Sequence, residues 1–549
     1  MDQQRIILSI KTRDYSQWTF DKPCDISPID SKLFHGDVIA PGGELIESKV
    51  RNMKQISGIL VLDDGKTYGR TSNGKRLLYR CIPDNNKLPV FLVPYDMKLG
   101  FSKDVKNKYV LFTFDKWTDK HPHGTIIETI GDVTDLNCYY EYQVQRRELN
   151  ESITKFSNKT RKLFGGIDEN LLITKIVDNS NYKIINRLSA PVITIDPLGC
   201  VDIDDGFSCA INEQTGIATM SIYIANVSIW MNEFELFHDI SRVSTIYLPG
   251  NRRTMLPAIL SDNLCSLLEN KHRIAVCMDV DVSSDGNVVG EPIFLNTLIC
   301  VKNNHSYDSP KMMRDQQYKS AMELTRKMKP TIRDSHELIE YWMVFMNVAC
   351  GEYLAKQRTG IFRNVRVKEK RTCSFENPNT QTFFGNWDNV SSDYSLLSNS
   401  TGHDTLDVKW YAQITSPIRR LVDLINQTEL MKSIGILSET SVLFTSAWFR
   451  QIDELNVKMK HIRRVQNDCE IMRTCYNEPD QLDTGIIFDE VVKDGVYKYN
   501  VYLENLRVIS SIKSQNSINL YSQHSFRIFL FVNETDKNRK IQIEKINAL

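Results

Sequence analysis

One stretch of the chain, ITIDPLGCVDIDDGFS, gathers four carboxylates within ten residues at the end of a predicted strand: Asp196, Asp202, Asp204 and Asp205. Carboxylates this close repel one another, which raises some of their pKa values unless cations neutralise them. Mg²⁺ is the natural counter-ion, because it prefers oxygen ligands and keeps bound waters for chemistry. The chain must therefore fold so that this loop either faces solvent or surrounds cations.

Two such ions about 3.5–4 Å apart can activate a water and stabilise the leaving oxygen of a phosphodiester. The loop thus predicts a site for two Mg²⁺ ions, for which Mn²⁺ can substitute. The alternatives are an acidic surface turn and a Ca²⁺ loop, although the spacing is not that of an EF-hand. Taken alone, the loop leaves the catalytic-metal interpretation and the acidic-turn interpretation equally open.

A second informative stretch, WYAQITSPIRRLVDLINQ, predicts the start of a helix. Ser416 is a good N-cap, and Pro417 suits the first helical position. Arg419 and Arg420 then fall in the first turn, where guanidinium groups and free N–H groups can hold a phosphate. Paired arginines are locally unfavourable there, which argues for a ligand. The alternative is a plain capped helix whose arginines pair with Asp423 or with the acidic loop.

Composition restricts the class of protein. The 549 residues include 68 basic and 68 acidic side chains, with 41% apolar and 25% charged residues. These values exclude a disordered chain, a collagen-like fibre and a disulfide miniprotein. If nucleic acid is the partner, positive charge must be concentrated locally.

The twelve cysteines form no CxxC pair, and we interpret them as reduced thiols. The N-terminus does not resemble a signal peptide, and no apolar run reaches the ~20 residues that span a bilayer. We expect an intracellular, cytoplasmic protein, with the nucleus, a virion or a virus factory as alternatives.

The pattern of apolar runs and turn residues along the chain predicts a multidomain α+β protein. The N-terminal part has short runs rich in Val, Ile, Phe and Tyr that are separated by turn residues, which predicts two small β-barrels of the OB or cold-shock kind. A mixed α/β region follows. Short strands near the C-terminus predict a third small barrel. The predicted domains are two barrels, a linker helix, a central α/β domain and a last barrel: 1–77, 78–148, 149–186, 187–480 and 481–549.

Within the central region, strands are predicted at 191–196 and 218–227, on either side of the acidic loop. Apolar residues at i, i+3, i+4 and i+7 predict a helix over 336–356. Further helices are predicted over 417–432 and 441–475. The segment 356–371 holds seven basic residues and one acidic, which indicates either the rim of a nucleic-acid channel or a solvated face.

The acidic loop and the SPIRR segment together resemble the ribonuclease II/ribonuclease R superfamily, whose catalytic module is the RNB domain. Further similar segments run in the same order along the chain, over roughly residues 30–549: STIYLPGNRRTMLP (244–257), LSDNLCSLLENKHRIA (260–275), IEYWMVFMN (339–347), GIFRNV (360–365) and TSPIRRLVDLI (415–425). The Gly199-Cys200 pair looks most like the eukaryotic branch of the exosome nuclease. No PIN domain precedes the first barrel, so we expect a free-standing monomer that is not tethered to the exosome.

The resemblance implies two cold-shock barrels, an RNB domain and a C-terminal S1-type OB barrel around a channel. Single-stranded RNA would enter by its 3′ end and be trimmed to 5′-monophosphates with little sequence preference. The metal ligands would be Asp196, Asp202, Asp204 and Asp205, and the catalytic residues Asp204, Asp202 and Arg419. The implied RNA contacts are Tyr247 by stacking, Arg419 at the scissile phosphate, Glu340 at a 2′-hydroxyl, and the neighbouring Arg420 and Arg363.

The chain departs from the family pattern at several positions. The family's His-Ile-Ala-Asp is Tyr223-Ile224-Ala225-Asn226, the Ala after the Asp pair is Gly206, and the His-Arg after SPIRR is Asn426-Gln427. The usual Tyr-Arg-x-His is Phe362-Arg363-Asn364-Val365, and a late Ala-Glu-Arg is Val465-Gln466-Asn467. These changes keep two alternatives open: an inactive RNA-binding scaffold, and a nuclease that cuts DNA or cuts internally.

Overall fold

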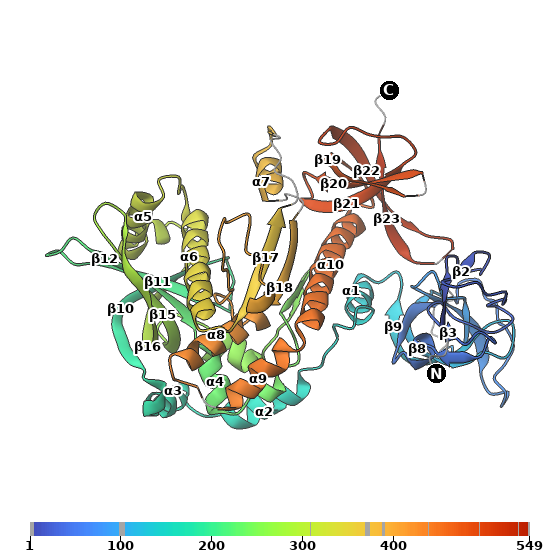
Figure 1. Ribbon diagram of the computed structural model, residues 1–549, viewed down its shortest axis with the longest axis horizontal. Helices are drawn as coiled ribbons and strands as arrows, with labels where there is room; N and C mark the ends of the chain where they lie inside the picture. Colours follow the sequence, from blue (N-terminus) through green and yellow to red (C-terminus); the bar gives the residue numbers. More distant parts are fainter. Residues whose placement is uncertain are drawn as a thin grey trace. The chain divides into compact units, whose positions relative to one another are not determined.

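The computed structural model describes residues 5–97, 105–307, 309–367, 374–386, 390–437, 439–493, 495–535 and 537–546. It divides into two compact units, one made of residues 1–150 with 464–549 and one of residues 151–463 (Figure 1). No helix in the described part of the chain is long and apolar enough to cross a membrane. Each unit is described in turn.

The first unit begins with a small antiparallel sheet in the order β2-β1-β3-β4. Its strands are β1 (Ile6–Ile10), β2 (Trp18–Phe20), β3 (Val38–Ile39) and β4 (Leu45–Glu47). Along β1 the residues alternate between buried and less buried, as expected of a strand with one face on a core. That core is shared with the next five strands, because Phe34 stacks on Phe91 with ring centroids 5.9 Å apart.

The next five strands form a closed barrel in the order β5-β6-β7-β9-β8. They are β5 (Ile56–Leu60), β6 (Leu77–Pro83), β7 (Phe91–Tyr95), β8 (Lys108–Lys116) and β9 (His123–Asp132). The boundary predicted at 77/78 is wrong, because β5 pairs with both β6 and β8 and so belongs to this barrel. Gly58 permits the close pairing, since a Cβ there would lie 2.7 Å from the carbonyl oxygen of Ile82.

The C-terminal part of the first unit is an antiparallel sheet in the order β21-β20-β19-β22-β23. Tyr499, Val501 and Phe526 are fully buried in its core. No pairing between the edge strands β21 and β23 is described, but these two strands contact each other, which approaches the expected closed S1-type barrel. The strands are β19 (Asp480–Lys493), β20 (Val496–Leu503), β21 (Val508–Ser514), β22 (Gln523–Val532) and β23 (Arg539–Lys545).

The predicted linker helix over 149–186 is replaced by two shorter helices, α2 (Thr154–Phe164) and α3 (Glu169–Val177), both in the second unit, and a further helix, α1 (Leu136–Gln145), precedes it in the first unit. Gly165 and Gly166 interrupt the helical pattern, and Gly166 has a φ of +79° that a side chain rarely adopts. Asp168 then caps α3 by accepting a hydrogen bond from the Asn170 N–H.

A second closed barrel forms the centre of the 151–463 unit, in the order β10-β11-β12-β15-β16. β10 pairs antiparallel with β11 and parallel with β16. The strands are β10 (Ile185–Asp196), β11 (Asp205–Ile211), β12 (Ala218–Ala225), β15 (His272–Val282) and β16 (Val288–Ser306). The predicted strand at 191–196 is confirmed as part of β10, and the one predicted at 218–227 is confirmed as β12, which ends two residues earlier.

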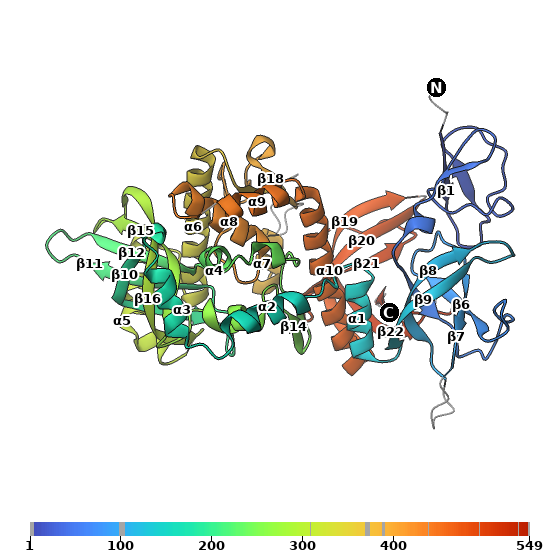
Figure 2. The same cartoon turned by 90° about the horizontal axis from the view of Figure 1, so that it is seen from below.

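Helices surround this barrel and carry the second sequence signature. α5 packs against β11, and α8 contacts β17. α8 also contacts α4, α6 and α9 (Figure 2). The predicted helix over 336–356 is confirmed as α6, whereas the one over 441–475 is broken into α9 and α10. The elements are α4 (Val227–Glu233), β13 (Ile246–Leu248), β14 (Asn251–Arg253), α5 (Gln316–Met328), α6 (Ser335–Lys356), β17 (Ile361–Val367), α7 (Pro378–Asn386), β18 (Val390–Leu396), α8 (Leu421–Ser433), α9 (Glu439–Phe449) and α10 (Ile452–Asn477).

Candidate active site

The four aspartates of the acidic loop line one cavity of about 410 Å³, which we call the acidic pocket. Asp196 ends β10 and Asp205 begins β11, so both lie at the same end of the barrel. The loop between them carries the other two carboxylates. The remaining side chains with polar groups in the wall of the pocket are Cys200, Tyr247, Arg252 and Arg419.

The local sequence explains the turn that holds this loop. Gly199 has a φ of +81°, and the Cys200 N–H donates to the carbonyl of Pro197 over 3.0 Å. At Gly206 a Cβ would lie 2.9 Å from the carbonyl oxygen of Ile193, a closeness that real Cβ atoms essentially never show. Glycine at this position, where the family has alanine, therefore allows β10 and β11 to approach closely.

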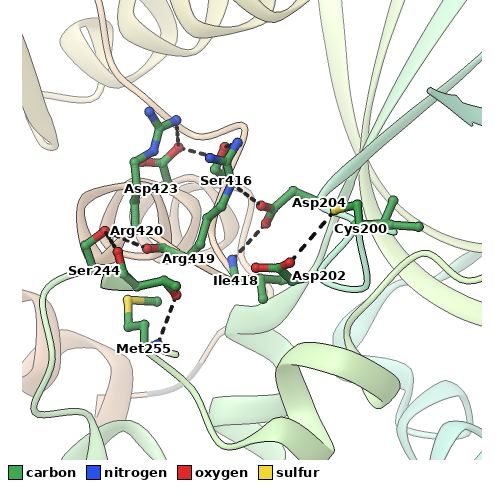
Figure 3. Close-up of polar contacts among 12 residues, drawn as sticks. Cys200, Asp202, Asp204, Ser244, Met255, Ser416, Ile418, Arg419, Arg420 and Asp423 are labelled. Carbon is green, nitrogen blue, oxygen red and sulfur yellow. Dashed lines mark hydrogen bonds and ion pairs between the residues drawn. The ribbon is translucent and has the colours of Figure 1, made fainter. Parts of the chain in front are cut away.

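Asp204 faces Arg419 across the pocket. Its carboxylate accepts one hydrogen bond from the Arg419 Nε–H and one from the Ile418 N–H, each 2.9 Å long (Figure 3). Only 2% of Asp204 is exposed. Burial raises the pKa of Asp204 to about 7, against the lowering effect of the Arg419 charge.

Asp202 is held by a second arginine. Arg252 places Nη1 2.7 Å from its Oδ1, and the Tyr247 hydroxyl donates to its Oδ2 over 3.1 Å. The other terminal nitrogen of Arg252 bonds Asp262, also at 2.7 Å. The Tyr247 side chain is anchored at its hydroxyl while 41% of the residue stays exposed, so its ring is available for stacking.

Burial perturbs both Asp196 and Asp205, and it raises the pKa of each carboxyl to about 7. The charges of Asp204 and Asp202 also raise the pKa of Asp196, and the charge of Asp196 raises the pKa of Asp205. The Asp196 Oδ2 atom is buried and has no hydrogen-bond partner among the described residues. A buried carboxylate oxygen without a donor is costly unless a cation or a proton satisfies it.

The chemistry of these side chains fits a divalent cation such as Mg²⁺, since all the candidate donors are carboxylate oxygens and one of them lacks a partner. Asp196 and Asp205 are the residues best placed to begin such a site. Over the described ranges, however, no three acidic, His or Cys side chains stand grouped as a ready ligand set. Asp202 and Asp204 bond arginines instead. The predicted four carboxylates thus share one pocket without forming one cluster.

The SPIRR segment differs from its prediction. α8 begins at Leu421, with Arg420 as its N-cap residue, so Ser416 does not cap it and neither arginine lies in its first turn. Asp423, an acid in the first turn as the helix dipole favours, accepts from the Ser416 N–H and from Arg420, both over 2.8 Å. Arg419 therefore faces the acidic pocket, whereas Arg420 pairs with Asp423 (Figure 3).

Two further predicted RNA contacts lie outside the acidic pocket. Glu340 is exposed on α6 and does not line it. Arg363 on β17 lines a different cavity. Of the basic segment 356–371, residues 368–371 lie outside the described part of the chain.

The sequence reasoning missed two residues near the carboxylates. Arg252 lies within the quoted segment STIYLPGNRRTMLP, where its charge was the available signal. The Tyr307 N–H donates to the carbonyl of Asp196 over 3.2 Å, and its ring stacks on His336 with centroids 3.8 Å apart. Burial and then the charges of Asp205 and Asp196 raise the pKa of Tyr307. No sequence pattern pointed to Tyr307.

Several departures from the family pattern have structural roles away from the pocket. Asn226 caps α4 by accepting from the Ile229 N–H at 3.3 Å, and its amide donates to Asn296. Asn426 bonds both the N–H and the carbonyl of Ile361, at 2.8 and 2.9 Å. Gln427 links α8 to the end of β12 through Ala225. All three amides are at most 1% exposed, so these changes alter the buried interior and leave the pocket carboxylates in place.

The comparisons with known proteins agree with this architecture. Residues 185–328 and 312–435 match the RNB domain family. Exoribonuclease 2 of Vibrio parahaemolyticus is 36% identical over 121 residues, which cover 22% of this chain and 18% of that protein. The matched stretches span only 18% to 23% of the first three curated relatives. Bacterial and eukaryotic proteins are both matched.

Solved structures extend the likeness to the other domains. RNase R of Mycoplasma genitalium, in complex with ribose-methylated single-stranded RNA, aligns with a TM-score of 0.70 at 15% identity, over 98% of this chain and 100% of that one. Yeast Ssd1, described as a pseudonuclease, aligns with a TM-score of 0.62 at 12% identity, over 95% and 80% of the two chains. The predicted multidomain α+β class is confirmed. The central region, residues 185–435, matches the RNB domain, in agreement with the resemblance noted in the sequence.

Proposed function

We propose that the protein is a hydrolytic, Mg²⁺-dependent 3′→5′ exoribonuclease that degrades single-stranded RNA to 5′-monophosphates inside the cell. The observation that carries the proposal is the pairing of Asp204 with Arg419 beside Asp196 and Asp205 in one pocket. Named ribonucleases among the relatives support a ribonuclease of the RNB type. The passage of RNA through a channel stays a prediction.

Each pocket residue then has a distinct task. The four aspartates would hold the divalent ions, which supply an activated water and charge stabilisation at the phosphate. The Arg419 side chain is 41% exposed and bonds Asp204 through Nε. Its terminal nitrogens can therefore bind phosphate oxygens. Tyr247 offers a ring on which the 3′-terminal base can stack. Arg252 positions Asp202, because one of its terminal nitrogens bonds Asp202 and the other bonds Asp262.

The test is a degradation assay on 5′-labelled single-stranded RNA with Mg²⁺ or Mn²⁺. The wild type should give a ladder that shortens from the 3′ end to a short oligonucleotide, and Asp204→Asn should abolish it. Asp285→Asn, in the exposed turn between β15 and β16, is the matched control and should cleave normally. Intact RNA with the wild type under both metals would rule the proposal out.

A second candidate is an RNA-binding scaffold without turnover. Two observations favour it: the described carboxylates do not stand as a ready metal site, and yeast Ssd1, a pseudonuclease, shares the fold. This candidate predicts salt-dependent binding of single strands without cleavage. A nuclease that acts on DNA or internally is separated by chimeric strands, because an RNA-specific exonuclease should stop at a deoxy stretch.

A further inference from the structure

A second cavity in the 151–463 unit lies beside the SPIRR segment. It measures about 180 Å³ and is lined by residues of β17, β18, α10 and the turn before α8. We call it the Arg420 pocket. The side chains that matter for its chemistry are Arg363, Asp393, Tyr394, Gln413, Arg420 and Arg463.

The charge of the Arg420 pocket is positive. Three arginines line it, and Asp393 is the single acid among the lining residues. Asp393 accepts a hydrogen bond from the Asn364 amide over 3.0 Å. Over the part of the chain that the structure describes, the guanidinium groups of Arg363 and Arg463 make no hydrogen bond or ion pair, so their donors are available to a ligand.

Arg420 supplies an unmet donor of its own. One terminal nitrogen bonds the fully buried Asp423 over 2.8 Å. Its Nε is buried and has no hydrogen-bond partner among the described residues. A buried guanidinium nitrogen without an acceptor is costly, and an anion that enters the pocket would satisfy it.

The other polar groups of the pocket do not compete for the arginines. The Tyr394 hydroxyl donates to the Gln413 side-chain oxygen over 2.6 Å. Burial raises the pKa of Tyr394, which keeps the phenol neutral. The Tyr394 N–H is fixed by Asn456 over 2.8 Å. The walls therefore hold three guanidinium groups and a phenol whose hydroxyl is already bonded to Gln413.

We propose that the Arg420 pocket is a phosphate site for an internal phosphodiester of the RNA strand, separate from the scissile phosphate at the acidic pocket. Arg419 and Arg420 are consecutive, yet one bonds Asp204 and the other lines this second cavity. A strand whose 3′ end lies in the acidic pocket has further phosphates upstream, and planar guanidinium forks match such diesters. This inference rests on the proposed function, because RNA is the ligand.

The experiment measures binding without turnover. A 5′-fluorescein oligoadenylate is titrated with the full chain in EDTA at several salt concentrations, for the wild type, Arg463→Gln and Arg363→Gln. Each lost phosphate contact should flatten the slope of log K against log salt by about 0.7 and weaken binding about 5-fold at 0.1 M salt. Arg464→Gln, the next residue of α10, removes the same charge outside the lining and should behave as the wild type.

The outcomes separate this inference from the proposed function. If the wild type binds or degrades RNA while both arginine variants keep its slope and affinity, the phosphate site is refuted and the proposed function stands. If inorganic phosphate inhibits the wild type but neither variant, and RNA affinity is unchanged, the pocket takes free phosphate, which also refutes the inference. A raised KM with unchanged kcat on Mg²⁺-dependent degradation would support it.

Discussion

The carboxylates of the acidic pocket and the buried amides of α8 differ in how their polar atoms are satisfied. In the acidic pocket, burial raises the pKa of Asp196, Asp204 and Asp205 to about 7, and an oxygen of Asp196 has no partner. On α8, the Asn426 amide is matched by main-chain groups of Ile361 and Gln413. A buried polar atom without a hydrogen-bond partner in the protein requires a ligand, whereas the buried amides already have their partners within the protein.

This contrast explains where the chain departs from the pattern of the RNB family. Asn226, Asn426 and Gln427 replace charged or ionisable residues at places where protein atoms supply every partner that we observe. Such a network can change composition if its members change together. Under the proposed function, the pocket carboxylates would bind a metal ion beside a phosphate, and the chemistry of those groups does not change.

The largest expected effect is on turnover. Arg419→Lys keeps a positive charge but loses the planar fork, so kcat should fall about a hundredfold or more if the fork stabilises charge at the phosphate. The thermal midpoint should change little, because the Arg419 side chain is 41% exposed. Steady-state degradation of RNA measures this, with Arg314→Lys, an exposed residue before α5, as control. A kcat equal to that of the wild type would remove Arg419 from catalysis.

The interior of α8 should show the reverse pattern. Asn426→Ala leaves the N–H and the carbonyl of Ile361 and the carbonyl of Gln413 without partners, which should cost about 2–4 kcal/mol of unfolding free energy. Urea unfolding measures it, and Asn399→Ala, at an exposed site, should be nearly neutral. The kcat of the folded fraction should stay unchanged; a selective loss of kcat would break the contrast between the two regions.

The pH dependence of stability tests the acidic pocket without RNA. Because the folded pKa values of Asp196, Asp204 and Asp205 are raised to about 7 from an ordinary 3.8, the folded state keeps protons that the unfolded state releases. Stability in EDTA should therefore fall as pH rises from about 4 to 7 and level off above pH 7. Mg²⁺ should reduce this loss by stabilising the ionised carboxylates.

The measurement is the thermal midpoint from pH 5 to pH 8, in EDTA and in Mg²⁺. Asp204→Asn removes one titrating group and should flatten the curve in EDTA, whereas Asp285→Asn should not. A midpoint that rises with pH in EDTA would show that these carboxyls do not have raised pKa values in the folded protein.

The smallest effect is expected at Gly206. Gly206→Ala restores the residue that the family usually has, but its Cβ would lie 2.9 Å from the Ile193 carbonyl oxygen and 3.2 Å from the Thr194 methyl. Overpacking of this kind should cost about 1 kcal/mol. Urea unfolding checks it, and a variant more stable than the wild type would show that β10 and β11 can separate without cost.

Much of the fold was predictable because local patterns and final structure agree. The apolar periodicity over 336–356 corresponds to α6, Ser335–Lys356, almost residue for residue. The predictions failed where a helical pattern in the sequence continued past residues that end the helix, and where paired strands lie far apart in the chain. Two glycines divide the expected linker helix, and β5 joins strands that lie up to about 50 residues further along.

The sequence by itself determined the resemblance to the RNB domain, the mixed α and β architecture and the chemical character of the acidic loop, because these follow from residue types and short spacings. Only the tertiary structure decided which partner each charged group has. It pairs Arg252 with Asp202 and Arg419 with Asp204. Arg420 pairs with Asp423 and lines a second cavity. The physical reason is that the Arg252–Asp202 and Arg419–Asp204 pairs join residues far apart in the chain, and their meeting depends on how the segment before α8 packs against the barrel. The local pair of Arg420 with Asp423, three residues on, was already an alternative in the sequence.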